Sequence, residues 1–272
     1  RSERPLRELD VRSLQRQLVE IGNLPAEVLD DSDSFPVARE RLESALQRQP
    51  WSLEDLALVV AHRDAALPLL RAALAAADSD ADRLGWARVL AVLGDGAGAE
   101  TLLAALDRAA WDEGQDIVTS GESGANYSPL DMLILALGRA GDRRAVAPIC
   151  AKAKQLNPQS GLSHFRAVAV ALETLADPSA AATLADLLQQ PGMTGHAIAT
   201  LADARRKRGE EEQRQGRTVR LINPALRELI LARALYRCGD QHGLGERILR
   251  QYEQDLQGPL ARHAHAVLGS RR

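Results

Sequence analysis

Aromatic residues are scarce in this sequence: Phe, Trp and Tyr together make up 3% of its 272 residues. Apolar residues as a whole reach 45%, so alanine and leucine must supply most of the core. Small and straight-chain apolar residues favour helices that pack closely side by side, whereas strands are enriched in β-branched and aromatic residues. The composition therefore predicts an all-α protein.

The sequence also lacks an excess of either charge and any long apolar run. Its formal net charge is −3 and its pI is about 6.1, so it has no overall positive field to attract nucleic acid or an anionic membrane. No stretch approaches the roughly 18 consecutive apolar residues of a membrane-spanning helix. We therefore expect a protein partner rather than a membrane or nucleic acid.

Cysteine is rare as well. Cys150 and Cys238 lie far apart in two apolar segments, which predicts buried free thiols rather than a disulfide. The sequence starts at Arg1, without Met and without a signal-like apolar segment, so we expect a piece of a longer protein. Its start specifies no compartment, and the cytoplasm is the one we favour.

A repeat organises most of the chain. Four apolar helical segments each end at an aspartate, at Asp95, Asp142, Asp177 and Asp240. An aspartate there can cap the following helix by accepting its free backbone N–H groups, and a glycine precedes it in three of the four copies, as suits a left-handed helix end. Each aspartate is followed by a second amphipathic stretch, at 101–106, 145–156, 180–188 and 244–252.

The four aspartates are 47, 35 and 63 residues apart. Intervals of this size predict stacked helix pairs, and the two longer ones imply insertions at about 111–127 and 191–223. A further pair fits at 53–60 and 65–76, broken at Asp64, and 258–269 fits a closing helix. We therefore predict a HEAT-like α-solenoid, an α-α superhelix of antiparallel helix pairs, over 34–272. Residues 1–33 would form an N-terminal helix and linker, the end of a preceding domain.

Two of the copies resemble HEAT repeats of the short bacterial, PBS-lyase type. The better match is Gly141-Asp-Arg-Arg-Ala-Val-Ala-Pro-Ile149, and the next is Asp177-Pro-Ser-Ala-Ala-Ala-Thr-Leu184. The resemblance covers roughly residues 50–268. It implies an armadillo-like solenoid that binds proteins.

The first insertion is predicted to be a loop, because it contains three glycines and no helical period. Ser128 fits the N-cap of the next helix and Pro129 its first residue. A long loop on a helical scaffold is a common place for function, although a surface excursion pinned by Trp111 and Tyr127 explains the sequence equally well. The candidate binding residues are Trp111, Asp112, Glu113, Tyr127, His164 and Arg166.

Two of those groups have alternative interpretations. His164 and Arg166 could project from the edge of a helix that Ser163 caps, but we expect a partly buried His164 that is hydrogen-bonded to a backbone carbonyl. The acidic residues Asp112, Glu113 and Asp116 could provide an acid–base pair or a cation site, but acidic residues in loops are usually only solvated.

The second insertion is predicted to add a helix at 195–207 with Ile198, Leu201 and Ala202 facing inward. A charged loop would follow at 209–217. The basic run at 205–208 is next to three glutamates and has no interleaved aromatic residue for stacking bases, so a solvated face is expected there.

No complete catalytic site is found. Gly94-Asp-Gly-Ala-Gly-Ala99 fits the glycine pattern of a dinucleotide site, but that site needs a preceding strand, and here the repeat helix precedes it. The six histidines form no HExxH pair. We therefore expect no catalytic, cofactor-binding or metal residue in this chain, and a non-catalytic scaffold for protein–protein or inter-domain contact.

A second resemblance gives an alternative function. Residues 9–22 predict an amphipathic helix capped by Asp10, and this stretch is similar to the final helix of the flavin domain in bacterial FAD-dependent oxidoreductases. That similarity implies a C-terminal helical region whose FAD-binding residues belong to a preceding domain, so none is assigned here. It continues at 110–114, 128–139 and 163–173.

Overall fold

The computed structural model describes residues 40–44, 53–112, 127–213 and 222–270. These residues form α-helices and short 3₁₀ turns with no strand among them, which confirms the predicted all-α class. None of the described helices is long and apolar enough to cross a membrane. The helix predicted at 9–22 lies outside the described residues.

The chain divides into two compact units, Arg1–Ala97 (unit 1) and Gly98–Arg272 (unit 2). The helices of unit 1 include α3 (Leu53–Ala61), α4 (Arg63–Ala76) and α5 (Asp80–Val92). Its core consists of buried aliphatic side chains, among them Leu42, Val59, Leu67, Leu70 and Leu90.

The break between α3 and α4 falls at His62, not at Asp64 as the sequence predicted. His62 has non-helical backbone angles, with φ −110° and ψ 40°, whereas Asp64 lies in the first turn of α4. A carboxylate is favourable in a first turn because it interacts with the positive end of the helix dipole.

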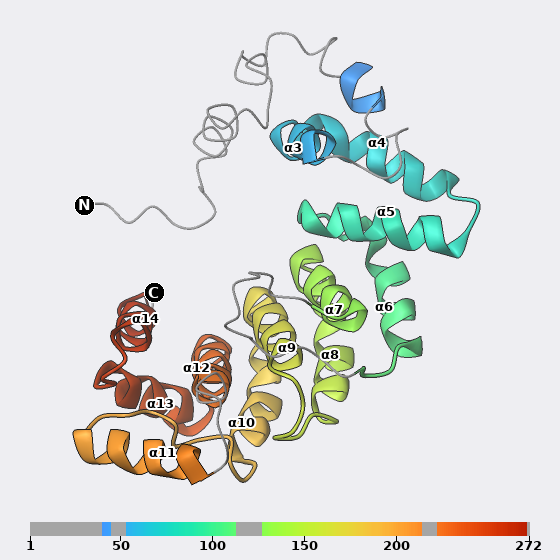
Figure 1. Cartoon of the computed structure of the whole chain (residues 1–272). Helices are drawn as coiled ribbons and strands as arrows, with labels where there is room; N and C mark the ends of the chain where they lie inside the picture. Colours follow the sequence, from blue (N-terminus) through green and yellow to red (C-terminus); the bar gives the residue numbers. More distant parts are fainter. Residues whose placement is uncertain (1–39, 45–52, 113–126, 214–221, 271–272) are drawn as a thin grey trace. The chain divides into compact units, whose positions relative to one another are not determined.

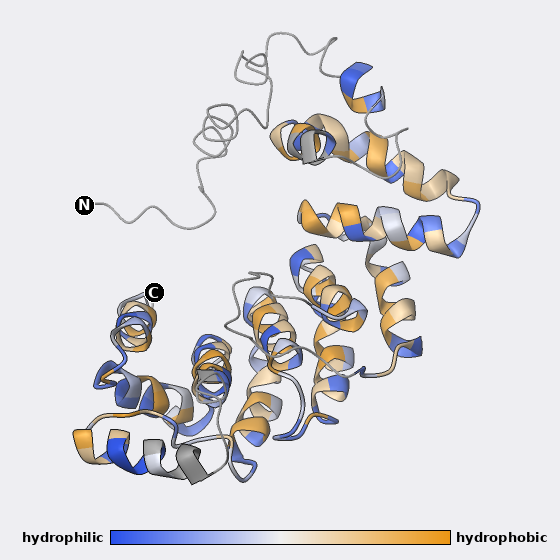
Figure 2. Cartoon of the chain, viewed as in Figure 1, coloured by the Kyte–Doolittle hydropathy of each residue, from blue (hydrophilic) through white to orange (hydrophobic). Residues whose placement is uncertain are grey.

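Unit 2 contains α6 to α14. Figure 1 shows α7, α9 and α12 side by side in one row and α6, α8 and α10 in a second row, and helices within each row are in contact. Hydrophobic residues predominate in α7 and α8, and hydrophilic ones in α11 (Figure 2). The bounds are α6 (Ala99–Arg108), α7 (Pro129–Ala140), α8 (Val146–Ala153), α9 (Leu162–Leu175), α10 (Ala181–Gln189), α11 (Leu201–Gln213), α12 (Ile222–Arg237), α13 (Leu244–Glu253) and α14 (Gly258–Gly269).

The junction aspartates are caps, as predicted. Asp95, Asp142 and Asp177 each accept a hydrogen bond from the backbone N–H two residues further on, at 2.9 Å in every case. Asp240 instead reaches across a longer turn to the N–H groups of Gly245 and Glu246, at 2.6 and 3.1 Å. In all four turns, therefore, one aspartate carboxylate accepts hydrogen bonds from free backbone N–H groups at the start of the next helical segment.

The residue before each aspartate has left-handed backbone angles, again as predicted. Gly94, Gly141 and Gly239 have φ values of 74°, 73° and 112°. The copy without a glycine places Ala176 in the same conformation, at φ 49°. The turn geometry is thus maintained even where the side chain does not favour it.

The helix of the second insertion differs from its prediction. It begins at Leu201 rather than 195 and continues to Gln213, so part of the expected loop is helical. Thr200 sets this start, because its hydroxyl accepts the N–H of Asp203 at 3.1 Å. Leu201 is 70% exposed rather than inward, and Ala202 is exposed as well, which leaves Ile198 as the partly buried member of the predicted set.

Candidate functional site

The first turn of α9 buries His164. The helix begins at Leu162 after Gly161, so Ser163 is not its cap but its second residue, and both Ser163 and His164 are buried. The expected burial of His164 against a backbone carbonyl, that of Asp112, is therefore confirmed. The alternative, a His164 that projects from a repeat edge, is wrong. The helix starts one residue before Ser163, and this phase turns His164 inward, with only 1% of its surface exposed.

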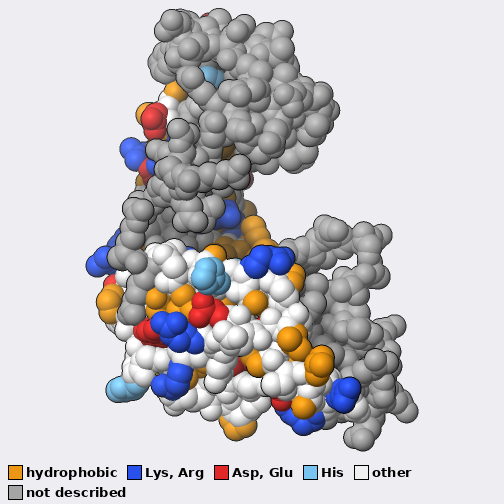
Figure 3. Space-filling model, turned by 90° about the vertical axis from the view of Figure 1, so that its left-hand side faces the viewer, with side chains coloured by type: hydrophobic (Ala, Val, Ile, Leu, Met, Phe, Trp, Pro, Cys, Tyr) orange, Lys and Arg blue, Asp and Glu red, His pale blue; other side chains and the backbone are white. Residues whose placement is uncertain are grey.

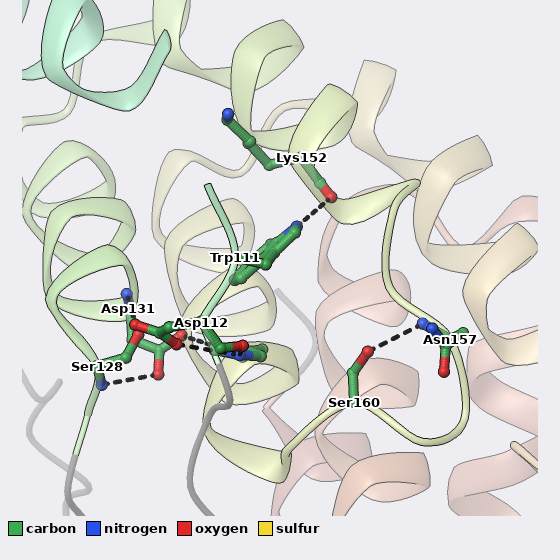
Figure 4. Close-up of polar contacts among 8 residues, drawn as sticks. Trp111, Asp112, Ser128, Asp131, Lys152, Asn157 and Ser160 are labelled. Carbon is green, nitrogen blue, oxygen red and sulfur yellow. Dashed lines mark hydrogen bonds and ion pairs between the residues drawn. The ribbon is translucent and has the colours of Figure 1, made fainter. Parts of the chain in front are cut away.

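Both ring nitrogens of His164 face oxygen acceptors. Nδ1 lies 2.6 Å from Oδ1 of Asp131 on α7, and Nε2 lies 3.1 Å from the backbone oxygen of Asp112. Figure 4 shows Asp112 and Asp131 close together. The Asp112 carboxylate is also near, at 3.4 Å from Nε2. Since carbonyl and carboxylate oxygens only accept hydrogen bonds, this geometry suits an imidazolium that donates from both nitrogens.

Asp131 is the fully buried partner of this imidazolium. Its carboxylate accepts the backbone N–H of Ser128 at 3.0 Å, and the Ser128 hydroxyl accepts the N–H of Asp131 at 3.1 Å. The Ser163 hydroxyl also donates to the carboxylate. These bonds form a capping box at the start of α7, with Pro129 in its first turn, and confirm Ser128 as the N-cap.

The protonation states agree with an ion pair. Burial by itself would lower the pKa of His164, but the hydrogen bonds and charges of Asp131 and Asp112 together outweigh it and raise that pKa above its ordinary value. Burial would likewise raise the pKa of Asp131, but hydrogen bonds from His164, Ser163 and Ser128 lower it overall. Both shifts favour the charged forms.

Trp111 lies against the same histidine. Its ring centroid is 4.5 Å from that of His164, and its indole N–H donates to the backbone oxygen of Lys152 on α8 at 3.0 Å. The Lys152 ammonium donates to the backbone oxygen of Ala109. The segment that follows α6 is thus fixed to α8 and α9, and it leaves Trp111 partly exposed.

Tyr127 is held from the other side of the insertion. The Arg166 guanidinium lies over its ring at 5.1 Å from the centroid, a cation–π contact. Arg166 and His164 are both on α9, so this one helix fixes the residues on each side of the first insertion. Both Tyr127 and Arg166 are partly exposed.

The structure therefore brings together five of the six predicted residues, and Glu113 lies outside the described residues, as does Asp116. Sequence reasoning missed Asp131 and Lys152. Asp131 carried a signal, because Ser128 and an acidic residue three positions later form a capping-box pattern. Nothing in the sequence marked Lys152.

The contacts of His164 are those of a structural residue that holds its neighbours in place, not those of an acid–base centre. A general base needs a free nitrogen within reach of substrate, but both nitrogens of His164 are engaged within the chain. Among the described residues, no group of three or more His, Cys, Asp or Glu side chains could hold a metal ion. The charged pair fixes neighbouring residues in place.

A second buried carboxylate holds the second insertion. Glu228 on α12 is fully buried and accepts the backbone N–H groups of Gly195 and His196, at 2.9 and 2.8 Å. The Tyr252 hydroxyl donates to the same carboxylate at 2.9 Å. Asp255 accepts the N–H of Ile198 at 2.7 Å.

The two predicted free thiols are confirmed: Cys150 and Cys238 are both buried and unbonded to each other. Burial raises the pKa of both thiols, that of Cys238 to about 12. Thiols of this kind are unreactive, so they add no nucleophile to the site.

The resemblance to the helical region of FAD-dependent oxidoreductases stays a prediction from the sequence. Comparison of the chain with protein-family models, curated proteins and solved structures finds no significant match to any of them.

Proposed function

We propose that this chain is a non-catalytic, HEAT-like helical-repeat scaffold that binds another protein or a covalently linked domain. Its contact surface would be the three partly exposed side chains Trp111, Tyr127 and Arg166, which we call the contact cluster. The observation that carries this proposal is their fixation: Trp111 contacts α8 and α9, and Tyr127 lies under the guanidinium of Arg166, a residue of α9.

Fixed side chains of these types are suited to binding proteins. Trp, Tyr and Arg are the residues most often found to dominate the affinity of protein interfaces. A cluster held in place before binding also loses less side-chain entropy when a partner docks. Within the cluster, Trp111 also packs against the ring of His164, a member of the buried His164–Asp131 pair.

The arrangement of unit 2 supports a solenoid. Similar capped turns recur at Asp142, Asp177 and Asp240, and helices of alternate positions lie in two rows. Repeated helix pairs of this kind generate extended binding surfaces. The first insertion would add the contact cluster to one edge of that surface.

A photo-crosslinking experiment tests the proposal. A photoreactive amino acid is placed at Tyr127 of the full chain in cells of its source organism, with a matched chain labelled at the exposed His265 (side chain 81% exposed) as the control. We expect one protein to be crosslinked from position 127 and not from 265, or a linked domain to be crosslinked if the chain is part of a longer protein.

The purified partner then gives the affinity. Trp111→Ala and Arg166→Ala should each weaken binding by about tenfold or more, and His265→Ala should not. Unchanged affinity in both contact-cluster variants would show that this surface is not the binding site.

A further inference from the structure

The row of α7, α9 and α12 leaves one stripe of side chains exposed on each helix. On α7 the exposed residues after Pro129 are Met132 and Arg139, which are seven residues apart and so lie on one side of the helix. On α9 the partly exposed Arg166, Val170 and Glu173 follow one another at intervals of four and three, and the exposed Thr174 comes four residues after Val170. The rest of both helices is almost entirely buried.

The stripe of α12 continues the same surface. Ile230, Arg233 and Arg237 are partly or fully exposed and again spaced by three and four residues. The guanidinium of Arg233 contacts the Glu173 carboxylate of α9 at 2.7 Å, and Arg237 contacts it too. The stripes of α9 and α12 therefore face the same way, and we call the three stripes together the α7–α9–α12 face.

This face is positively charged although the whole chain carries −3. Its charged residues are four arginines and one glutamate, so positive charges outnumber negative ones within the stripes. Aliphatic side chains lie between the arginines: Met132 is 46% exposed, and Val170 and Ile230 are partly exposed. A surface that combines arginine and aliphatic side chains is complementary to an acidic, aliphatic segment.

We infer that the α7–α9–α12 face binds an acidic protein segment that carries aliphatic side chains, such as a helix with leucines on one side and glutamates around them. This inference rests on the proposed scaffold function and names the chemistry of its partner. The contact cluster adjoins the face through Arg166, which belongs to both.

Other occupants fit less well. Single-stranded nucleic acid needs exposed aromatic faces for base stacking, but here the stripes are aliphatic and Tyr127 is covered by Arg166. A second copy of the chain, docked through the same face by a twofold axis, would place like charges opposite one another. Neither matches the mixture of arginine and aliphatic groups.

The side of unit 2 that α11, α13 and α14 form carries both charges. Figure 3 views the molecule from the side of α11, α13 and α14 and shows blue and red side chains next to one another. On α13, for example, Arg250 pairs with Glu246 at 2.8 Å. Arg247, also exposed on α13, therefore offers a charge-matched control position.

The test is a selection of displayed random peptides on the purified full chain, repeated with Arg139→Glu and with Arg247→Glu. Both variants change one exposed arginine to glutamate, but only Arg139 is on the α7–α9–α12 face. We expect the enriched peptides to be acidic and to contain regularly spaced aliphatic residues. A synthetic copy of the best peptide should bind Arg139→Glu about tenfold more weakly than wild type and Arg247→Glu equally well.

Several outcomes would overturn the inference. They are enrichment of basic or neutral peptides, no enrichment at all, equal binding of the acidic peptide to both variants, and self-association or binding of single-stranded nucleic acid that Arg139→Glu abolishes. The proposed function is judged separately by crosslinking from Tyr127. A crosslinked partner whose contacting segment is not acidic would leave the scaffold standing and refute this inference alone.

Discussion

At the first insertion of unit 2, a histidine and an aspartate from two different helices form a buried ion pair. At the second, a buried carboxylate accepts two successive backbone N–H groups. Both arrangements place a fully buried acid, Asp131 or Glu228, beside a non-helical segment. The arrangement at Asp131 depends on the charge of a partner side chain, His164. The arrangement at Glu228 depends on backbone N–H groups, which do not titrate. The first should therefore be sensitive to pH and the second to the loss of its carboxylate.

The largest effect is expected from Glu228→Ala. It would remove the acceptor of the partly buried N–H groups of Gly195 and His196 and one of the two acceptors of the Tyr252 hydroxyl, the other being the backbone oxygen of Ala225. This loss should lower the free energy of unfolding by about 4 kcal/mol. Urea denaturation measures this value. The control Glu246→Ala removes a carboxylate from an exposed pair and should cost less than about 0.5 kcal/mol. Equal costs would show that the second insertion is not held by this carboxylate.

His164→Ala should follow, at about 3 kcal/mol, because it leaves the Asp131 carboxylate buried without a counter-charge. The cost should be smaller in an Asp131→Asn background, where no charge is left unpaired, while the exposed His265→Ala should change stability little. A double-mutant cycle in urea measures the coupling. Strictly additive costs would rule out the ion pair as the source of the stability.

Tyr252→Phe should have a smaller effect, about 1 kcal/mol, because it removes one hydrogen-bond donor and retains the ring. Burial and the charge of Glu228 raise the pKa of Tyr252, so the hydroxyl stays protonated and donates over the whole working range of pH. The free energy of unfolding again provides the measurement. A cost as large as that of Glu228→Ala would mean that the tyrosine, rather than the backbone N–H groups, is the main partner.

The smallest effect is the pH dependence of the His164–Asp131 ion pair, because titration can remove only part of the stability that His164→Ala removes. The raised pKa of His164 means that its stabilisation is complete below the ordinary value of 6.5 and is lost as pH rises through the raised value. The lowered pKa of Asp131 means that the stabilisation by its carboxylate is lost only at acid pH, as the pH falls below 3.8 through the lowered value. The difference in unfolding free energy between wild type and His164→Ala should therefore shrink from pH 5.5 to pH 9. A difference that stays constant or grows would contradict the assignment.

The sequence predicted what depends on neighbours along the chain. The caps at Asp142 and Asp177 involve a backbone N–H only two residues away, and the Ser128-Pro129 start of α7 is equally local. Such features are determined by short-range sterics and hydrogen bonding, so residue type and spacing suffice.

What the sequence did not predict depends on packing between distant segments. The partner of His164 lies 33 residues away on another helix, and a fully buried carboxylate contradicts the usual exposure of aspartate. Residues 195–198 are not helical because Glu228 and Asp255 take their N–H groups, a competition that no local pattern reveals.

The close contact of Gly138 with Ala171 has a consequence for the register of the two helices. A Cβ atom on Gly138 would lie 2.5 Å from the Cα of Ala171, so only glycine permits this approach of α7 and α9. Seven residues separate Asp131 from Gly138, and seven separate His164 from Ala171. The two helices thus run in the same direction and meet at two points one heptad apart, a polar point and a steric one. A shift of α9 by a single residue would break the His164–Asp131 contact and the Gly138–Ala171 contact at once. Two independent contacts therefore fix the register of this pair of helices.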